Sequence, residues 1–322
     1  MNITRRTLLH SAVFTGISVA LPAMAAGTQS VGGPAFGSTW RVVTPVGPSV
    51  FEIKESITAI VENVDKTMSP WRANSEISRL NHARNTDWHP LSAATCAVLA
   101  ESLEVSILTE GAFDPSIGPL VNRFGFGPIR QGGGVLGDLD LNPNAAKKRD
   151  PELTLDLCGI AKGYALDQMV AALGVLGLNN FLIELGGEVS VLGHHPDGRP
   201  WTIGIEQPGT APVQFQRIIA PGVLALATSG TMTNGFRVGG RHLNHIIDPH
   251  QKRPVDNQIA SVSVLAATAM RADALATALT VMGVQDGAKL AERENISALF
   301  LTGTGPEFTE TMTGSFADYV LI

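Results

Sequence analysis

Apolar residues recur at every third or fourth position in several stretches of the chain, which is the spacing of one face of a helix. The clearest case is residues 51–68, where apolar side chains fall at Ile53, Ile57, Ile60, Val61 and Val64. Ser75 and Ser92 suit the capping positions of two further helices, over 75–81 and 92–109, and the second ends before Gly111. The pattern also predicts helices over 268–282 and 285–294.

Strands are predicted where short runs are rich in apolar and β-branched residues. These runs are residues 36–44, 153–157, 181–185, 188–192, 201–206, 215–219, 223–228, 245–247, 260–266, 296–301 and 319–322. Residues 127–151 are rich in Gly, Pro and Asn and are expected to form loops around one short strand. Because helices precede and interrupt the runs of strands without regular alternation, the sequence predicts an α+β fold.

The first 26 residues predict a cleaved export signal. Arg5 and Arg6 precede an apolar run over 12–21, and Ala23-Met24-Ala25 is a small-x-small cleavage site. The paired arginines indicate the twin-arginine route, with a general secretory signal as the alternative. Residues 27–34 are interpreted as a linker, so that 35–322 form the functional domain, and the expected location is the periplasm.

Composition narrows the class of protein. With 44% hydrophobic and 16% charged residues among 322, the chain can bury a substantial core. A net charge of −6 argues against nucleic acid as a partner. Outside the signal no stretch reaches the roughly 18 apolar residues of a membrane span. Cys96 is expected to be buried in a helix, and a disulfide with Cys158 stays open.

Residues 156–168 carry the most informative chemistry. Asp156 ends a predicted strand, Gly159 and Gly163 flank the turn, and Lys162 lies in the first turn of a helix. Backbone N–H groups at a helix start attract anions, and glycine permits a ligand to approach closely. The segment therefore reads as a phosphate or pyrophosphate cradle, although an ordinary strand-to-helix turn explains it equally well.

A second candidate site lies on the predicted helix 268–282. Asp273 and Thr277 are four residues apart and therefore share one face, among mostly apolar neighbours. A carboxylate in apolar surroundings is costly unless it is paired. Carboxylate and hydroxyl oxygens, with backbone carbonyls and water, suit Mg²⁺. The alternative is an Asp273 that pairs with Arg271 or faces solvent.

A third group of candidates is less specific. His245 lies just before a turn at Asp248-Pro249 and could act as a base, although a structural role is the commoner one for such a histidine. Trp71 and Arg72 could offer a stacking face beside a cation. Several familiar sites are absent from the sequence, namely a P-loop, a dinucleotide-binding glycine fingerprint, a zinc-protease motif and a nucleophile elbow.

Taken together, these segments resemble the FAD:protein FMN transferase (ApbE) family. The matches follow the family order and nearly span the mature chain. They are the strand at 36–40, Ser69 with Trp71-Arg72, the S-E-I-S-R-L-N motif at 75–81, G-A-F-D-P at 111–115, F-G-F-G at 124–127, the D-L-x-G-I-A-K-G-Y-A pattern at 156–165, G-G-E at 186–188, A-T-S-G at 227–230, H-I-I-D-P at 245–249 and the helix segment at 272–279.

The resemblance implies an ApbE-like fold, related to the T-fold, with mixed and antiparallel sheets and packed helices. It implies that the enzyme cleaves FAD, attaches FMN by a phosphoester bond to a Thr or Ser of a protein, and releases AMP with the help of Mg²⁺. The implied metal ligands are Asp273 and Thr277 with backbone carbonyls near Gly159 and Ala276. The implied FAD contacts are Phe36, Trp71, Ala112, Phe113, Asp114, Asp156, Lys162 and Ile247. His245 is the candidate base, with Asp273 as the second catalytic residue, while Asp248 is expected to orient His245 or shape its turn.

The acceptor implied by the resemblance is an extracytoplasmic FMN-binding domain of a membrane electron-transfer system, for example an accessory flavoprotein of nitrous oxide respiration. Two alternatives stay open: an Mg²⁺-dependent FAD pyrophosphatase, and a non-catalytic FAD-binding or flavin-trafficking protein. Cys158 and Phe36 replace residues usual in the family. The chain also departs from the family pattern at 231–241 and 250–254, where a protein substrate could dock.

Overall fold

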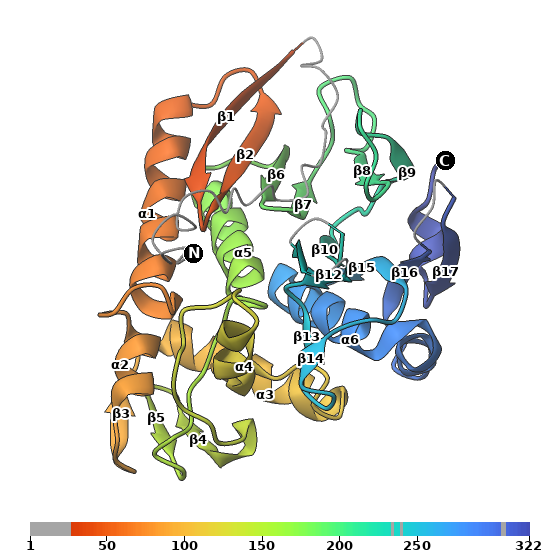
Figure 1. Cartoon of the computed structure of the whole chain (residues 1–322). Coiled ribbons are helices and arrows are strands. Elements are labelled where there is room, and N and C mark those ends of the chain that lie inside the picture. The colour runs from red at the N-terminus through yellow and green to blue at the C-terminus, as the bar shows by residue number, and fades with distance from the viewer. Residues whose placement is uncertain (1–26, 233–234, 239–240, 304–306) are drawn as a thin grey trace, which may run out of the picture.

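The computed structural model describes residues 27–232, 235–238, 241–303 and 307–322, so the predicted export signal lies outside the described residues. An eight-stranded sheet in the order β1-β2-β6-β7-β10-β15-β16-β17 forms the centre of the fold, with the neighbouring strands antiparallel (Figure 1). Its strands are β1 (Thr28–Ala35), β2 (Ser38–Pro45), β6 (Phe181–Leu185), β7 (Glu188–Leu192), β10 (Ala225–Gly230), β15 (Ile259–Ala266), β16 (Ser297–Thr302) and β17 (Thr309–Thr313). In the part of the chain that the structure describes, no helix is both long and apolar enough to cross a bilayer.

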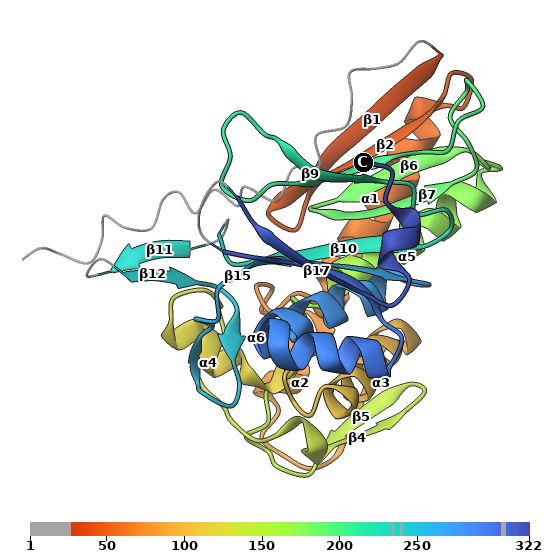
Figure 2. The same cartoon turned by 90° about the vertical axis from the view of Figure 1, so that its right-hand side faces the viewer.

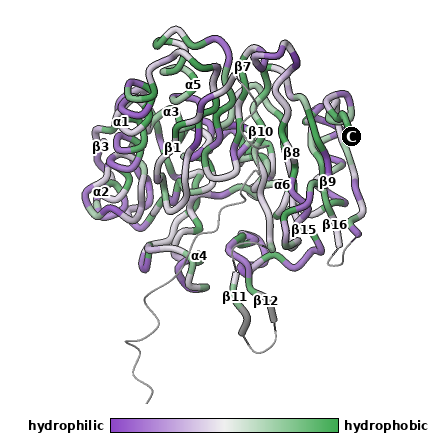
Figure 3. The backbone as a smooth tube through the Cα atoms, turned by 90° about the horizontal axis from the view of Figure 1, so that it is seen from above, coloured by the Kyte–Doolittle hydropathy of each residue, from purple (hydrophilic) through white to green (hydrophobic). Residues whose placement is uncertain are grey.

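Helices and short hairpins surround this sheet. The helices are α1 (Val50–Met68), α2 (Glu76–His82), α3 (Ala93–Leu108), α4 (Gly118–Arg123), α5 (Ala161–Val175) and α6 (Ala269–Arg293), with short 3₁₀ turns η1 (Pro115–Ile117), η2 (Leu136–Asp138) and η3 (Phe316–Tyr319). The smaller sheets are formed by β3 (Trp88–Pro90), β4 (Leu139–Asn142) and β5 (Ala145–Lys148), by β8 (Ile203–Glu206) with β9 (Phe215–Ile219), by β11 (Gly235–Val238) with β12 (Arg241–Asn244), and by β13 (Ile247–Asp248) with β14 (Arg253–Pro254). Figure 3 shows the β11–β12 hairpin lying outside the body of the fold.

Each face of the central sheet buries its own apolar core. The larger core contains side chains of α1, α5 and α6, and the smaller one contains Trp201, Ile203, Ile205, Ile219 and Phe316 from the β8–β9 hairpin, the segment before it and η3. Figure 2 shows the sheet strands between α6 on one side and β9 on the other. Because side chains alternate between the two faces of a strand, neighbouring residues of one strand serve different layers.

Most predicted elements are confirmed, including the caps at Ser75 and Ser92, whose hydroxyls accept hydrogen bonds from the backbone N–H groups of Ser78 and Thr95. The two helices predicted at 268–282 and 285–294 form one element, α6, that is interrupted at Gly283, where φ is +74°. Cys96 is buried as expected, and both cysteines are free thiols.

The linker predicted over 27–34 is wrong, because residues 28–35 form β1 and pair with β2 along the whole length of both strands. Its glycines serve packing here: a Cβ at Gly33 would lie 2.9 Å from Nε1 of the buried Trp40. A polar, glycine-rich composition does not reveal that a partner strand is present.

The strand predicted at 153–157 is also wrong, although Leu153, Leu155 and Leu157 are fully buried. The Asn81 side chain donates to the Leu155 carbonyl and accepts from the Leu155 N–H, both at 2.8 Å, and thereby replaces a neighbouring strand. Elsewhere, 127–151 contains two short strands instead of one, and 245–247 contributes only Ile247 to a strand. Tyr319 ends a 3₁₀ turn, so 319–322 is not a strand, and β17 was not predicted.

Helices α5 and α6 pack together closely, and Asp167 of α5 fixes their relative position. Its carboxylate accepts hydrogen bonds from the backbone N–H groups of Ala269 (2.7 Å) and Met270 (2.9 Å), the first two residues of α6. These N–H groups have no partner within their own helix, so a carboxylate there stabilises the start of α6.

Replacing Asp167 by alanine is expected to lower the free energy of unfolding by about 2 kcal/mol, because two helix-start N–H groups lose a charged acceptor. Urea unfolding of both proteins measures the change. Gln168→Ala, at the exposed neighbouring position of α5, serves as the control and is expected to have little effect. Equal midpoints for the wild type and Asp167→Ala would contradict this role.

Candidate active site

Asp273 is a buried carboxylate at the contact between α6 and the start of α5. Its side chain is 4% exposed, and Oδ2 accepts the backbone N–H of Gly163 at 3.1 Å. Arg271 pairs with Glu101 at 2.7 Å, and Asp273 is not exposed, so neither sequence-based alternative for Asp273 holds. Burial raises the pKa of Asp273, and the Lys162 ammonium and the Gly163 N–H oppose the shift.

Thr277 and Gly159 lie at the same place as Asp273. A Cβ on Gly159 would be 3.6 Å from Thr277 Oγ1, and the Ser229 hydroxyl of β10 lies 3.2 Å from the same atom. Three separate elements therefore meet here: one face of α6, the end of β10 and the turn that precedes α5.

The oxygen atoms at this meeting point fit a hard cation. Only Oδ2 of Asp273 accepts a hydrogen bond from the described residues, which leaves Oδ1 for another ligand. Across the described parts of the chain, no three His, Cys, Asp or Glu side chains cluster as a metal site would require. A carboxylate, a hydroxyl and a carbonyl with added water would suit Mg²⁺ better than a transition metal. The Ala276 carbonyl already accepts the Thr280 hydroxyl at 2.7 Å, so it is a weaker candidate than the other three groups.

Lys162, in the first turn of α5 as predicted, forms an ion pair with Glu188 at the start of β7. Glu188 is only 2% exposed, and its Oε2 has no hydrogen-bond partner among the described residues. Burial acts to lower the pKa of Lys162, but the carboxylates of Glu188 and Asp273 raise it above its usual value. Burial also raises the pKa of Glu188. Since two buried carboxyl groups share one ammonium group, further positive charge beside Asp273 would be stabilised.

Replacing Lys162 by methionine is expected to lower the free energy of unfolding by about 3 kcal/mol at pH 7, because Glu188 would stay buried without its cation. Replacing Glu188 by glutamine in the same protein is expected to restore most of this loss. Urea unfolding of the two single variants and the double variant measures the coupling. Strictly additive losses would show that the pair does not interact.

The segment 156–159 forms a tight turn beside the predicted FAD contacts at 112–114. Asp156 accepts the Cys158 N–H at 3.0 Å, and the Asp156 N–H donates to the Pro115 carbonyl at 2.8 Å. A Cβ on Gly159 would lie 3.3 Å from the Phe113 ring. The structure therefore brings Ala112, Phe113 and Asp114 next to this turn, although the Asp114 carboxylate is engaged by the N–H and hydroxyl of Ser116.

The cradle predicted at the start of α5 differs from a simple anion site. The helix begins at Ala161 without a side-chain cap, as is expected of an anion cradle. However, the N–H of Gly163 already donates a hydrogen bond to Asp273. Lys162 is held by Glu188 instead of projecting freely. The start of α5 thus already contacts the carboxylate of Asp273. A phosphate that binds here would meet backbone N–H groups, the Lys162 ammonium and the carboxyl groups of Asp273 and Glu188.

The other predicted site residues lie on separate turns, and their roles stay predictions. Phe36 occupies the β1–β2 turn with φ of +50°, and Trp71 is 61% exposed in the turn after α1. Ile247 is buried in β13, and His245 precedes it, edge-on to Phe126 with ring centres 6.3 Å apart. Asp248 shapes its own turn, as expected, by accepting the N–H groups of His250 and Gln251.

Three residues of this region had no assigned role in the sequence analysis: Glu188, Ser229 and Asp167. Glu188 and Ser229 lie in strands, next to glycines, where alternation of side chains gives only the face and not the partner. Asp167 lies in the helix that follows the cradle, five residues beyond Lys162. A carboxylate among mostly apolar neighbours on a helix indicates a buried, paired group, because burying it unpaired is costly. This pattern holds for Asp167 as much as for Asp273.

Comparison with known proteins adds independent information. The profile of the ApbE family matches residues 36–300. An FAD:protein FMN transferase of Vibrio cholerae is 37% identical over 305 residues, which cover 89% of this chain and 91% of that protein. An FAD:protein FMN transferase of Escherichia coli is 28% identical over 309 residues, covering 90% and 88% respectively.

Solved structures agree with the sequence comparison. The flavin transferase ApbE from Vibrio cholerae superposes with a TM-score of 0.81 at 35% identity, over 91% of this chain and 99% of that one. The apo flavinyl transferase ApbE of Pseudomonas stutzeri gives a TM-score of 0.80 at 32% identity, over 91% and 96%. The predicted α+β, ApbE-like fold is thus confirmed, and this chain belongs to the ApbE family.

Proposed function

We propose that this chain is a magnesium-dependent transferase that moves FMN from FAD to a Thr or Ser hydroxyl of an acceptor protein and releases AMP. The observation that carries the proposal is the convergence of Asp273, Thr277 and Gly159 beside the Lys162–Glu188 pair. The names of the relatives in Vibrio cholerae and Escherichia coli support the same reaction.

In the proposed reaction, the acceptor oxygen forms a bond to the FMN phosphorus while the bond to the bridging pyrophosphate oxygen breaks, and AMP leaves. Asp273, Thr277 and the Gly159 carbonyl would hold Mg²⁺, which neutralises charge on the pyrophosphate. Lys162 adds a fixed positive charge at the start of α5. His245 would take the proton of the acceptor hydroxyl, and Trp71 and Phe36 would offer apolar faces to the flavin nucleotide.

The proposed setting is the periplasm, reached by the twin-arginine route. It follows from the paired arginines and the small-x-small site within residues 1–26. The proposed acceptor is an FMN-binding domain of a membrane electron-transfer system, with an accessory flavoprotein of nitrous oxide respiration as one candidate.

Incubating the purified protein with FAD, Mg²⁺ and a set of such extracytoplasmic FMN-binding domains tests this proposal. We expect flavin fluorescence that stays on an acceptor band after denaturing electrophoresis, together with AMP release. Rapid AMP release without any acceptor would instead indicate a pyrophosphatase. Bound FAD with no AMP release in the presence of Mg²⁺ would indicate a binding protein.

A further inference from the structure

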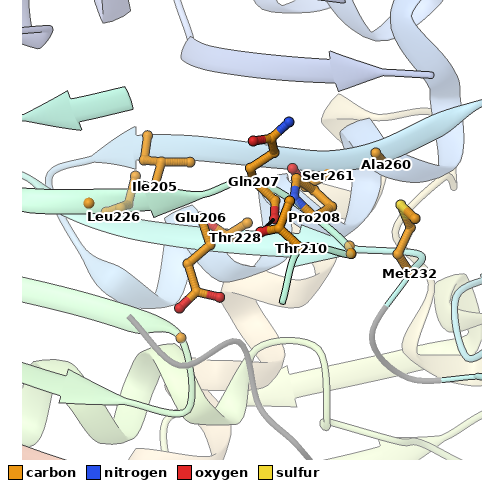
Figure 4. Close-up of a pocket in the computed structure, with 14 residues that line it drawn as sticks. Ile205, Glu206, Gln207, Pro208, Thr210, Leu226, Thr228, Met232, Ala260 and Ser261 are labelled. Atoms are coloured by element: carbon orange, nitrogen blue, oxygen red, sulfur yellow. Dashed lines mark hydrogen bonds between the residues drawn. The ribbon is translucent and has the colours of Figure 1, made fainter. Parts of the chain in front are cut away.

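A hollow of about 210 Å³ lies between the β8–β9 hairpin and the central sheet, and none of the residues assigned to FAD lines it. Its walls come from Gly204 to Thr210 on and after β8, from β10 and from β15, and Gly187 and Met232 also line it. Figure 4 shows the side chains of Thr210, Thr228 and Ser261 gathered in the middle, with Met232 at one end and Ile205 and Leu226 at the other.

This hollow lies on the opposite face of the same strands that carry the candidate active site. On β10, Ser229 faces Thr277 of α6, whereas Thr228 and Gly230 line the hollow. On the β7 side, Glu188 faces Lys162, whereas the preceding Gly187 lines the hollow. Leu226 of β10 pairs with Val189 of β7 in antiparallel register. Two residues further along β10 and two residues back from Val189, the same register sets Thr228 beside Gly187. One thickness of sheet therefore separates the hollow from the candidate metal ligands.

Strands β7 and β10, which separate the hollow from the candidate site, both end close to the hollow. Strand β10 ends at Gly230 and β7 begins at Glu188, directly after Gly187, so both strands stop at this edge. Gly187 and Gly230 have no side chains there. Beyond Gly230 the chain stays bonded to β15, because the Thr231 N–H donates to the Ala260 carbonyl at 3.1 Å. A polypeptide that occupies the hollow would have to pass Gly187, at the start of β7, to reach the side of Ser229 and Thr277.

The size and the chemistry of the hollow indicate its occupant. It is smaller than the roughly 300–1,000 Å³ of pockets that hold a cofactor-sized ligand. Among the described residues that line it, Glu206 is the one charged residue, and Figure 4 shows its carboxylate pointing away from the threonines. Ser261 is 3% exposed, and its Oγ has no hydrogen-bond partner among the described residues. A buried hydroxyl without a partner lowers stability unless a ligand satisfies it.

We propose that this hollow binds the acceptor protein, by seating the short, uncharged segment of small residues that flanks the target hydroxyl. The inference rests on the transfer reaction proposed above. In the complex, a backbone or hydroxyl group of that segment pairs with Ser261 Oγ, while the adjoining Thr or Ser extends past Gly187 to the phosphate.

Met232→Trp tests the proposal, because this side chain lines the hollow, is 38% exposed, and can be enlarged without changing the core. With an FMN-binding domain that the wild type flavinylates, kcat/KM for the acceptor is expected to fall at least about tenfold, equivalent to 1.4 kcal/mol. The Kd for FAD, measured by flavin fluorescence, is expected to stay within about twofold of the wild type. Val223→Trp, at an exposed position outside the hollow, is the matched control and should behave as the wild type.

Hydrogen exchange on the wild-type protein gives a second readout that needs no variant. Adding the acceptor domain is expected to slow amide exchange in residues 204–210, on the β8 side of the hollow, whereas FAD alone is not. Unchanged kcat/KM in Met232→Trp, or no slowing by the acceptor, would overturn the proposal. Slowing by FAD alone would also overturn it, by assigning the hollow to FAD. A wild type that flavinylates no acceptor refutes the proposed transfer reaction itself, which is a separate result.

Discussion

Replacing Asp273 by asparagine is expected to lower kcat of FMN transfer by about 10²- to 10³-fold, the scale of losing one charge-stabilising contact in a transition state. The carboxylate is the only charged group in the proposed metal ligand set, and a neutral amide is a poor ligand for Mg²⁺. An asparagine side-chain oxygen can still accept the Gly163 N–H, so the fold should be retained. The measurement is the rate of acceptor labelling at saturating FAD and Mg²⁺.

The stability of the same variant separates a lost ligand from a damaged fold. Burial raises the pKa of Asp273, so the folded protein binds more protons at this group than the unfolded chain does. The stability linked to this group therefore falls as pH rises from the pKa in the unfolded chain to the raised pKa in the folded protein. An uncharged amide removes this cost, so Tm at neutral pH should not decrease. Mg²⁺ should raise Tm of the wild type but not of the variant.

Asp286→Asn, at an exposed carboxylate of the same helix, is the control for this experiment. Its activity and its response to Mg²⁺ should match those of the wild type. Near-full activity in Asp273→Asn would remove the metal assignment. A lower Tm without Mg²⁺ would instead show that Asp273 holds α5 and α6 together more than it binds metal.

Elements that depend on local pattern could be predicted from the sequence. The spacing of apolar residues located α1, and the serine caps predicted for α2 and α3 follow from side-chain chemistry within four residues. The shared face of Asp273 and Thr277 likewise follows from helix geometry alone. The segment at 153–157 shows the limit of such reasoning, because burial of its leucines resembles a strand while Asn81, 74 residues earlier, provides its hydrogen bonds.

The rest of the candidate site could not be predicted, because it depends on contacts between distant parts of the chain. Lys162 and Glu188 are 26 residues apart, Ser229 and Thr277 are 48 apart, and Gly163 and Asp273 are 110 apart. Periodicity gives the face on which each residue lies but not the residue that faces it. The family resemblance supplied candidate ligands, and the structure added the second carboxyl group that shares the Lys162 charge.

Replacing Gly163 by alanine is expected to impair both the fold and the reaction, because at this glycine the backbone of α5 lies directly against the start of α6. A Cβ there would lie 2.3 Å from the Ala269 carbonyl oxygen and 2.7 Å from the Met270 Cα, both backbone atoms that no side-chain rotation can move. The helices would have to separate. The Asp273 contact with the Gly163 N–H and the Asp167 contacts with the start of α6 would then lengthen together.

We expect Gly163→Ala to lower the free energy of unfolding by about 3 kcal/mol, the upper end of typical overpacking costs. We also expect kcat/KM to fall about 10²-fold, because displacing catalytic groups by about 1 Å costs roughly that much. Gly174→Ala is the matched control: it lies on the same helix, and a Cβ there meets no atom within 4 Å. It should leave activity unchanged and stabilise the helix by about 0.5–1 kcal/mol. Similar behaviour of the two variants would show that the close approach of α5 and α6 does not position Asp273.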